Sequence, residues 1–219
     1  MPDHPLKPML LFDLDGTLWD SAAPVAESWN QIFQREDPSL PLLTVEDIHG
    51  VMGMTMREIS ETLYRSWQHP RRAEIFDECC TWEVEYLHTH CGALYPDLRP
   101  VMESLRARGF DLGIVSNCQA GYIRAFLNSS GSADLFTDYE EWGRTGKVKG
   151  ENIRLVLARN GNRKGIYIGD TKKDQEASLL AGTPFIHAAY GFGTAENPDG
   201  VIHSLAELPA EVLRVMSAR

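Results

Sequence analysis

Short runs of consecutive apolar residues, each ending at a polar loop, predict the strands of this protein. The first run, Met9 to Phe12, is apolar at every position and stops at Asp13. A continuous apolar run of this length is typical of a strand that is buried on both faces. Comparable runs predict strands at 112–115, 165–168 and 185–189, and Val201-Ile202 predicts a short strand at a sheet edge.

Helical periodicity dominates residues 21–92. Apolar residues recur there at the three- and four-residue spacings of an amphipathic helix, and no strand pattern interrupts them. Thr55 followed by Glu58 has the spacing of a capping box, which predicts a helix start. The three predicted stripes comprise Val25, Trp29, Ile32 and Phe33; Met56, Ile59, Leu63 and Trp67; and Phe76, Cys80, Val84, Leu87 and Cys91. We therefore expect this segment to be all-helical.

From residue 93 onward, helices and strands alternate. Helical stripes over 98–105, 153–157 and 177–181 each precede a predicted strand and end near a glycine. Alternation of this kind predicts a parallel sheet with helices on both faces. The predicted fold class is therefore α/β, with a Rossmann-like parallel-sheet core formed by residues 1–20 and 93–219 and an inserted all-helical domain at residues 21–92.

Composition and charge narrow the list of partners. The 219 residues carry a formal net charge of −10, which repels phosphodiester backbones and anionic lipids, so we expect neither nucleic acid nor membrane as a partner. No apolar run approaches the ~20 residues that span a bilayer. Met1 to Pro8 carries Asp3, His4 and three prolines where a signal peptide would be apolar. We expect a cytoplasmic protein with reduced cysteines, and the sequence does not predict its oligomeric state.

Polar side chains stand directly after three of the predicted strands. They are Asp13, Ser116 and Asp170, joined by Asp15 two positions and Asp174 four positions further on. Because ligands of a parallel sheet bind at the carboxyl ends of its strands, we expect these side chains to converge. Clustered carboxylates repel one another unless a cation lies among them, and oxygen ligands favour Mg²⁺. The pattern predicts a magnesium site suited to phosphoryl transfer.

Four segments, in this order, resemble the motifs of the haloacid dehalogenase superfamily. They are Asp13-Leu14-Asp15-Gly16-Thr17, Ser116-Asn117, a lysine at 147 or 149, and Gly169-Asp170-Thr171-Lys172-Lys173-Asp174. The inserted helical domain is similar to a C1-type cap, and the whole chain resembles the phosphoglycolate phosphatase-like branch. The resemblance implies a Mg²⁺-dependent phosphatase that hydrolyses a small organic phosphomonoester through an aspartyl-phosphate intermediate.

The resemblance also implies a role for each motif residue. Asp13 would be the nucleophile, and Asp15 would protonate the leaving oxygen and later activate water. Asp13, the Asp15 backbone carbonyl and Asp170 would bind Mg²⁺. Ser116, Asn117 and the motif lysine would bind the phosphoryl oxygens.

The motif lysine has two candidates, because the Lys-Pro pair common in the family is absent here. Lys149 stands at the start of the helix predicted through Ile153, so we prefer it to Lys147. Asp174 would orient this lysine or a metal-bound water, although it also fits an ordinary acidic residue in the first turn of a helix.

Two other functions stay open. A phosphosugar mutase resembling β-phosphoglucomutase would use the same motifs but return the phosphoryl group to the sugar. A noncatalytic sensor of a phosphorylated ligand would need neither the nucleophile nor the acid. Dehalogenation is disfavoured, because family members that dehalogenate lack the second aspartate, here Asp15.

Three further patterns favour ordinary structural roles. The group Cys79, Cys80, His88, His90 and Cys91 does not have the spacing of a usual zinc site, so we interpret it as a packed helix. Met52, Met54 and Met56 favour core filling over a substrate pocket. The segment Gly191-Phe192-Gly193 matches no nucleotide-binding motif, and we expect a surface loop near the site.

Overall fold

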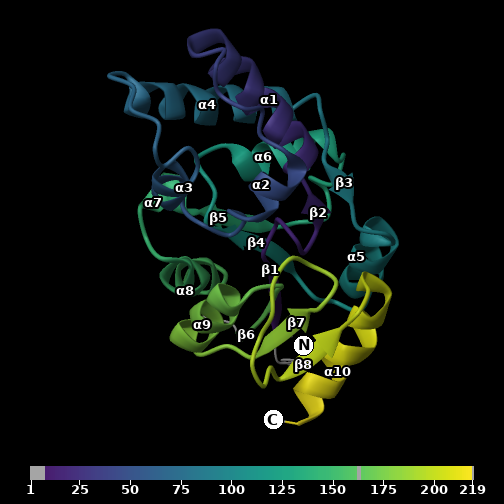
Figure 1. Ribbon diagram of the computed structural model, residues 1–219. Coiled ribbons are helices and arrows are strands. Elements are labelled where there is room, and N and C mark those ends of the chain that lie inside the picture. Colours follow the sequence, from purple (N-terminus) through teal and green to yellow (C-terminus); the bar gives the residue numbers. More distant parts are fainter. Residues whose placement is uncertain (1–7, 162–163, 219) are drawn as a thin grey trace.

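The computed structural model describes residues 8–161 and 164–218, and at its centre lies a six-stranded sheet (Figure 1). The strand order is β5-β4-β1-β6-β7-β8, and each neighbouring pair is parallel. In sequence order the strands are β1 Met9–Phe12, β4 Leu112–Ser116, β5 Asp138–Glu141, β6 Gly165–Gly169, β7 Phe185–Ala188 and β8 Gly200–Ile202. The predicted α/β fold class is confirmed.

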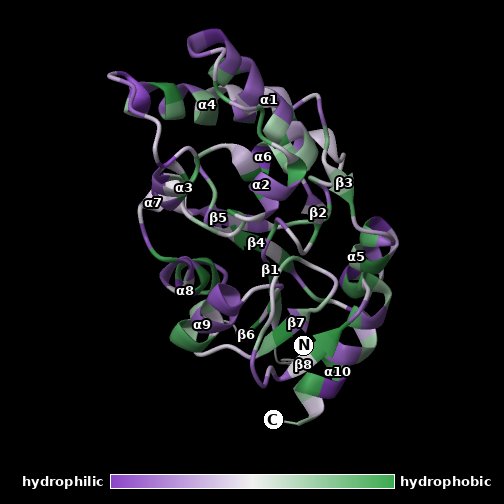
Figure 2. Ribbon diagram, viewed as in Figure 1, coloured by the Kyte–Doolittle hydropathy of each residue, from purple (hydrophilic) through white to green (hydrophobic). Residues whose placement is uncertain are grey.

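Strand β1 shows why helices cover both faces of the sheet. Successive side chains of a strand point to opposite faces. Met9 and Leu11 therefore pack under helices α8 (Lys149–Arg159) and α9 (Lys172–Ala181). Leu10 and Phe12 belong to the larger core on the other face. Its sheet-covering helices are α5 Leu98–Ala107, α6 Tyr122–Ser129 and α10 Leu208–Ser217. Figure 2 shows mixed polar and apolar residues along α5 and α10 beside the apolar strands β7 and β8.

Four helices follow the first strand before the chain returns to the sheet. They are α1 Ala22–Glu36, α2 Val45–His49, α3 Met56–Thr62 and α4 Arg72–Leu87. The entry strand β2 (Trp19–Asp20) and the exit strand β3 (Ala93–Leu94) pair antiparallel. In Figure 1, α1 and α4 lie together at one end of the molecule, while α2 and α3 lie nearer to the sheet. The domain boundaries at 20/21 and 92/93 stay a prediction.

The sequence pattern did not predict β5, α6, α10 or the short helix α7 (Trp142–Thr145). Strand β5 reads Asp-Tyr-Glu-Glu and has no apolar run. As the edge strand, it is held partly by polar contacts: Arg159 donates to Asp138 at 2.6 Å and to Glu140 at 2.7 Å. Apolar periodicity therefore could not reveal this strand.

Two predicted stripes extend beyond their helices. Helix α3 ends at Thr62, the chain turns at Tyr64 with a φ of +49°, and Trp67 lies outside the helix. Helix α4 ends at Leu87, so the exposed Cys91 is not part of it. The predictions that these helices include Trp67 and Cys91 were wrong. Apolar spacing continued past the helix ends because side chains in turns, such as Trp67, also pack against the core.

Residues 1–7 lie outside the described residues, and with them lies most of the N-terminal pattern that argued against a signal peptide. Among the helices that the structure describes, none combines the length and the apolar character needed to cross a bilayer.

Candidate active site

Neighbouring strands bring the predicted site residues to one edge of the sheet. Asp13 follows β1, Ser116 ends β4, and Asp170 follows β6, and these three strands are adjacent in the sheet. Their exposed fractions are 2%, 5% and 0%. Buried polar groups of this kind require partners, which the surrounding residues supply in part.

Lys149 lies between two of the carboxylates. Its Nζ donates to Asp13 Oδ1 at 2.9 Å and to Asp174 Oδ1 at 2.6 Å. Position 149 is the first residue of α8 and is only 4% exposed, whereas Lys147 is exposed in the preceding loop. The structure thus brings Lys149, and not Lys147, to Asp13.

Asp174 is held rigidly for its contact with Lys149. Its Oδ2 accepts hydrogen bonds from the Thr171 backbone N–H at 3.0 Å and the Thr171 hydroxyl at 2.6 Å. Thr171 is the N-cap of α9, so this is a capping box. Asp174 is therefore a first-turn helix acid, and the same side chain also binds the buried lysine.

Burial and mutual repulsion dominate the electrostatics of the site. Burial, followed by the charge of Asp174, raises the pKa of Asp13 to about 7, while Lys149 opposes the shift. Burial by itself lowers the pKa of the Lys149 ammonium, but Asp13 and Asp174 raise that pKa above its ordinary value. Burial and the charges of Asp174 and Asp13 raise the pKa of Asp170 to about 8. These carboxylates carry more negative charge than Lys149 alone neutralises.

Asp170 is enclosed by glycine-containing loops. Its Oδ2 accepts a hydrogen bond of 2.7 Å from the Phe192 backbone N–H. A Cβ atom at Gly16, whose φ is +77°, would collide with the Asp170 carboxylate, and a Cβ at Gly191 would collide with Asp170 Cβ. The segment 191–193, expected as a surface loop near the site, thus contacts a site carboxylate directly.

The carboxylate cluster fits a Mg²⁺ ion. Asp13, Asp170 and Asp174 each offer an oxygen, and these oxygens lie within 4.8 Å of one another. Asp170 Oδ1 is buried and has no hydrogen-bond partner among the described residues. Both oxygens of Asp174 are already occupied by Lys149 and Thr171. Asp13 and Asp170 therefore remain as carboxylates for a hard cation, which matches the one or two carboxylates that Mg²⁺ usually takes from a protein.

The Asp15 carboxylate points away from this cluster. Its Oδ1 accepts hydrogen bonds from the Ser21 hydroxyl at 2.7 Å and from the Tyr122 hydroxyl at 3.0 Å. Burial raises the pKa of Asp15, although the bonds from Ser21 and Tyr122 oppose the shift. A raised pKa favours the protonated form, which is the form that a general acid needs.

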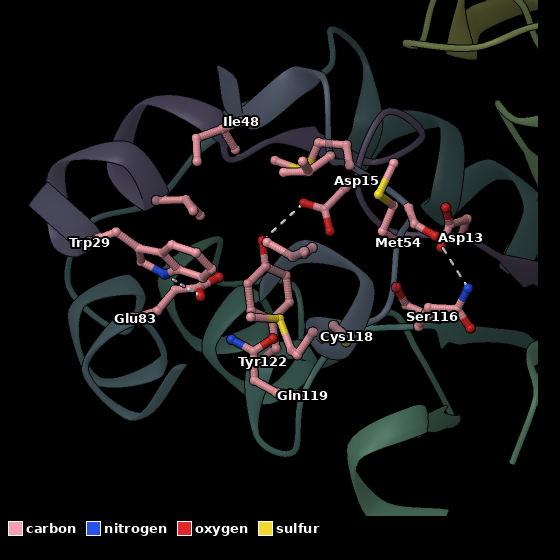
Figure 3. Close-up of a pocket in the computed structure, with 17 residues that line it drawn as sticks. Asp13, Asp15, Trp29, Ile48, Met54, Glu83, Ser116, Cys118, Gln119 and Tyr122 are labelled. Carbon is pink, nitrogen blue, oxygen red and sulfur yellow. Dashed lines mark hydrogen bonds between the residues drawn. The ribbon is translucent and has the colours of Figure 1, made fainter. Parts of the chain in front are cut away.

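A cavity with a volume of about 50 Å³ lies between the sheet edge and the inserted helices. Asp13, Asp15 and Ser116 line it from the core, and Met52, Met54 and Met56 are among the apolar side chains that line it from the helical segment. These methionines pack against the core, as expected, and they also line the cavity, a role that the sequence analysis had disfavoured. In Figure 3, Asp13 and Ser116 lie at one end of the cavity and Trp29 and Glu83 at the other.

The Asn117 side chain makes a contact with the helical segment that the sequence did not predict. Its Nδ2 donates to the Gly53 carbonyl at 3.4 Å, so the amide side chain joins the sheet edge to the helical segment. Sequence reasoning did not find Tyr122 or Glu83. Tyr122 follows no strand directly, and Glu83 lay between the apolar positions of its predicted stripe, so no local signal marked either residue.

Comparisons with known proteins agree with this arrangement. A family model described as haloacid dehalogenase-like hydrolase matches residues 10–188. The chain is 27% identical to a phosphoglycolate phosphatase of Vibrio parahaemolyticus, with 91% of this chain and 93% of the relative covered. It is 28% identical to a phosphoglycolate phosphatase of Vibrio vulnificus, with 94% and 96% covered. The crystal structure of a predicted phosphoglycolate phosphatase from Haemophilus somnus has the same fold, with a TM-score of 0.80, 20% identity and coverage of 92% and 96%.

Proposed function

This chain belongs to the haloacid dehalogenase-like hydrolase family, and we propose that it is a Mg²⁺-dependent phosphatase that hydrolyses a small organic phosphomonoester. The observation that carries the proposal is the buried contact of Lys149 with Asp13, beside the unpartnered oxygen of Asp170. The carboxylate of Asp13 can act as a nucleophile, the ammonium group of Lys149 is fixed beside it, and Asp170 offers an oxygen for a hard metal ion. Together these groups suit an anionic phosphoryl group. The relatives named phosphoglycolate phosphatase support this substrate class.

Asp13 acts as the nucleophile in this proposal. A carboxylate oxygen of Asp13 forms a bond to phosphorus while the bond from phosphorus to the leaving oxygen breaks. Asp15 gives its proton to the leaving oxygen, which departs as an alcohol. Asp15, now ionised, accepts a proton from water, and that water attacks the aspartyl phosphate and releases inorganic phosphate and free Asp13.

Asp13, the Asp15 carbonyl and Asp170 would hold the Mg²⁺ ion. A bound Mg²⁺ supplies positive charge that neutralises the phosphoryl oxygens. Lys149, at the start of α8, contributes a second positive charge. We assign the Ser116 hydroxyl and Asn117 to the remaining phosphoryl oxygens. Asp174 orients Lys149. These groups lower the repulsion between an anionic nucleophile and an anionic substrate.

The helical segment 21–92 acts as a cap in this proposal. Its polar contacts with the core include Glu58, which accepts from Lys173 Nζ at 3.1 and 3.2 Å, and the Gly53 carbonyl, which accepts from Asn117. Apolar side chains of the segment, such as Trp29, also share one hydrophobic core with the sheet. The Glu58–Lys173 pair is exposed, and exposed pairs of this kind contribute about 1 kcal/mol or less. In this proposal the cap opens for substrate entry and closes to exclude bulk water. The expected cytoplasmic location stays a prediction.

One assay separates the phosphatase from a mutase and from a sensor. The purified protein is incubated with Mg²⁺ and a panel of small phosphomonoesters and sugar phosphates, and both free phosphate and sugar-phosphate isomers are measured. We expect stoichiometric phosphate release without isomerisation. Interconversion of sugar phosphates without net phosphate release would indicate a mutase, and binding without any turnover would indicate a sensor.

A further inference from the structure

The distal end of the active-site cavity holds polar groups that the proposed chemistry does not use. Glu83 on α4 is 4% exposed and lines the cavity together with Trp29 and Gln119. The Trp29 indole Nε1 donates to Glu83 Oε2 at 2.7 Å. Figure 3 shows this group at the end of the cavity opposite Asp13. A buried carboxyl group in an apolar helix bundle is costly unless it has a specific partner or function.

Gln119 offers a hydrogen-bond donor at the same end. Its Nε2 is buried and has no hydrogen-bond partner among the described residues. Glu83 retains capacity to accept further hydrogen bonds, because one N–H from Trp29 does not use all the lone pairs of a carboxyl group. The distal end thus presents to the cavity an acceptor and an amide N–H that makes no hydrogen bond of normal geometry, although Gln119 lies close enough to Glu83 to oppose the rise in its pKa.

The remaining walls of the cavity are mostly apolar and lack positive charge. The described residues that line it include no Lys, Arg or His. Val25, Ile48, Val51 and the three methionines supply much of the apolar surface. Burial raises the pKa of Glu83 to about 8, against the opposing effect of Trp29 and Gln119, and this shift favours the protonated form of the carboxyl group. An anionic substituent on the leaving group would therefore be buried beside Asp15 without a cation to neutralise it.

We propose, resting on the phosphatase function proposed above, that Glu83 and Gln119 recognise an uncharged hydroxyl group at the far end of a short, otherwise apolar leaving group. The hydroxyl donates to Glu83 and accepts from Gln119 Nε2, so both partners are satisfied by one group. The cavity volume of about 50 Å³ favours a short leaving group. The carboxylate of phosphoglycolate does not fit this end of the cavity, although the relatives quoted above are named for that substrate.

A series of alkyl phosphates tests the proposal. The compounds have straight chains of two to four carbons, with the phosphate at one end and a methyl, hydroxyl, ammonium or carboxylate group at the other. Phosphoglycolate is one of the carboxylate-ended compounds. We expect the best hydroxyl-ended compound to exceed its methyl-ended analogue in kcat/KM by about tenfold or more, which is the effect of one well-made hydrogen bond. We expect the carboxylate-ended compounds to be worse than the hydroxyl-ended ones by about a hundredfold or more, because their charge is buried without a partner.

Variants connect the preference to the two residues. Glu83→Met and Gln119→Met should each reduce the ratio of hydroxyl-ended to methyl-ended kcat/KM to within about threefold, since the hydrogen bond is lost. Glu85→Met is the matched control, because Glu85 lies on the same helix but is exposed, and it should keep the wild-type ratio. If Glu83→Met does not fold, the ratio of hydroxyl-ended to methyl-ended kcat/KM can still be measured with Gln119→Met and Glu83→Gln.

A binding measurement separates failure of this inference from failure of the phosphatase assignment. Calorimetry with Asp13→Asn as the background should show tighter binding of the hydroxyl-ended phosphate than of the methyl-ended one, and Glu83→Met should remove the difference. Phosphate release with a preference for carboxylate-ended or ammonium-ended substrates would overturn only the inference. Absence of phosphate release from every compound would overturn both the inference and the function on which it rests.

Discussion

Lys149 Nζ and Asp174 Oδ1 lie 2.6 Å apart in the protein interior, although 25 residues separate them in the chain. Asp174 is itself fixed by the capping box with Thr171 at the start of α9. The first turn of one helix thus orients the lysine that begins another helix. This relationship places the ammonium group against Asp13 without a contribution from the exposed loop that contains Lys147.

The two candidate lysines should differ strongly in their effect on catalysis. We expect Lys149→Ala to lower kcat/KM by about a hundredfold or more, because a buried charge that meets the transition state is removed. Lys147→Ala should have little effect, since this residue is exposed. Steady-state kinetics of both variants measure the difference, and a larger loss for Lys147→Ala would contradict the assignment.

Asp13→Asn should abolish turnover but preserve the fold. An amide is a poor nucleophile and a poor metal ligand. Folding should tolerate the change because Lys149 keeps its bond to Asp174, and because the pKa of Asp13, raised to about 7, already makes its neutral form accessible. Phosphate release and thermal unfolding are the measurements. Activity above about a tenth of wild type would exclude Asp13 as the nucleophile.

Asp15→Asn should remove acid–base catalysis and leave Mg²⁺ binding intact. The Asn carbonyl oxygen can still accept from Ser21 and Tyr122, and the expected metal contact at this position is a backbone carbonyl. The loss should be smaller for an aryl phosphate than for an alkyl phosphate, because a phenolate leaves without prior protonation. Kinetics with both substrates and metal titration by calorimetry test these points; loss of Mg²⁺ binding would contradict the prediction.

Removal of divalent metal ions by a chelator should abolish phosphatase activity, and added Mg²⁺ should restore that activity. Ca²⁺ should occupy the same site without supporting comparable turnover, because its larger and looser coordination shell misplaces the nucleophile. Activity with each ion, together with competition of Ca²⁺ against Mg²⁺, measures the effect. Equal rates with the two ions would contradict this geometric argument.

Glu83 should make the protein less stable as the pH rises from 4.5 to about 8. Burial raises the pKa of Glu83 from 4.5 to about 8. Between these values the folded state binds more protons at this residue than the unfolded state, so its contribution to the free energy of unfolding falls with increasing pH, by a few kcal/mol in total. Glu83→Gln should flatten that part of the pH profile in urea unfolding, whereas the exposed-site control Glu85→Gln should not. An unchanged slope in Glu83→Gln would show that this carboxyl group is not buried as described.

Local patterns in the sequence were sufficient to predict most of the sheet and the motif residues. Runs such as 9–12 and 165–168 are apolar because their strands are buried on both faces, and that burial leaves a direct signature in the sequence. Polar residues at the strand ends, including Asp13 and Asp170, could then be placed at one edge because parallel strands share their direction. The acidic edge strand β5 escaped prediction because its residues have no apolar run.

Tertiary structure alone decided which side chains meet across the chain. The sequence already favoured Lys149 over Lys147 from the predicted helix start, but the contacts of Lys149 with Asp13 and Asp174 depend on how α8 and α9 pack against β1. The polar end of the cavity requires Glu83 from the inserted helices and Gln119 from the loop after β4, which meet only when the two parts of the chain pack together. The sequence by itself determined the elements and the chemical groups, because these depend on residue type and short spacing. Distances between residues far apart in the chain depend on packing, and no local pattern encodes them.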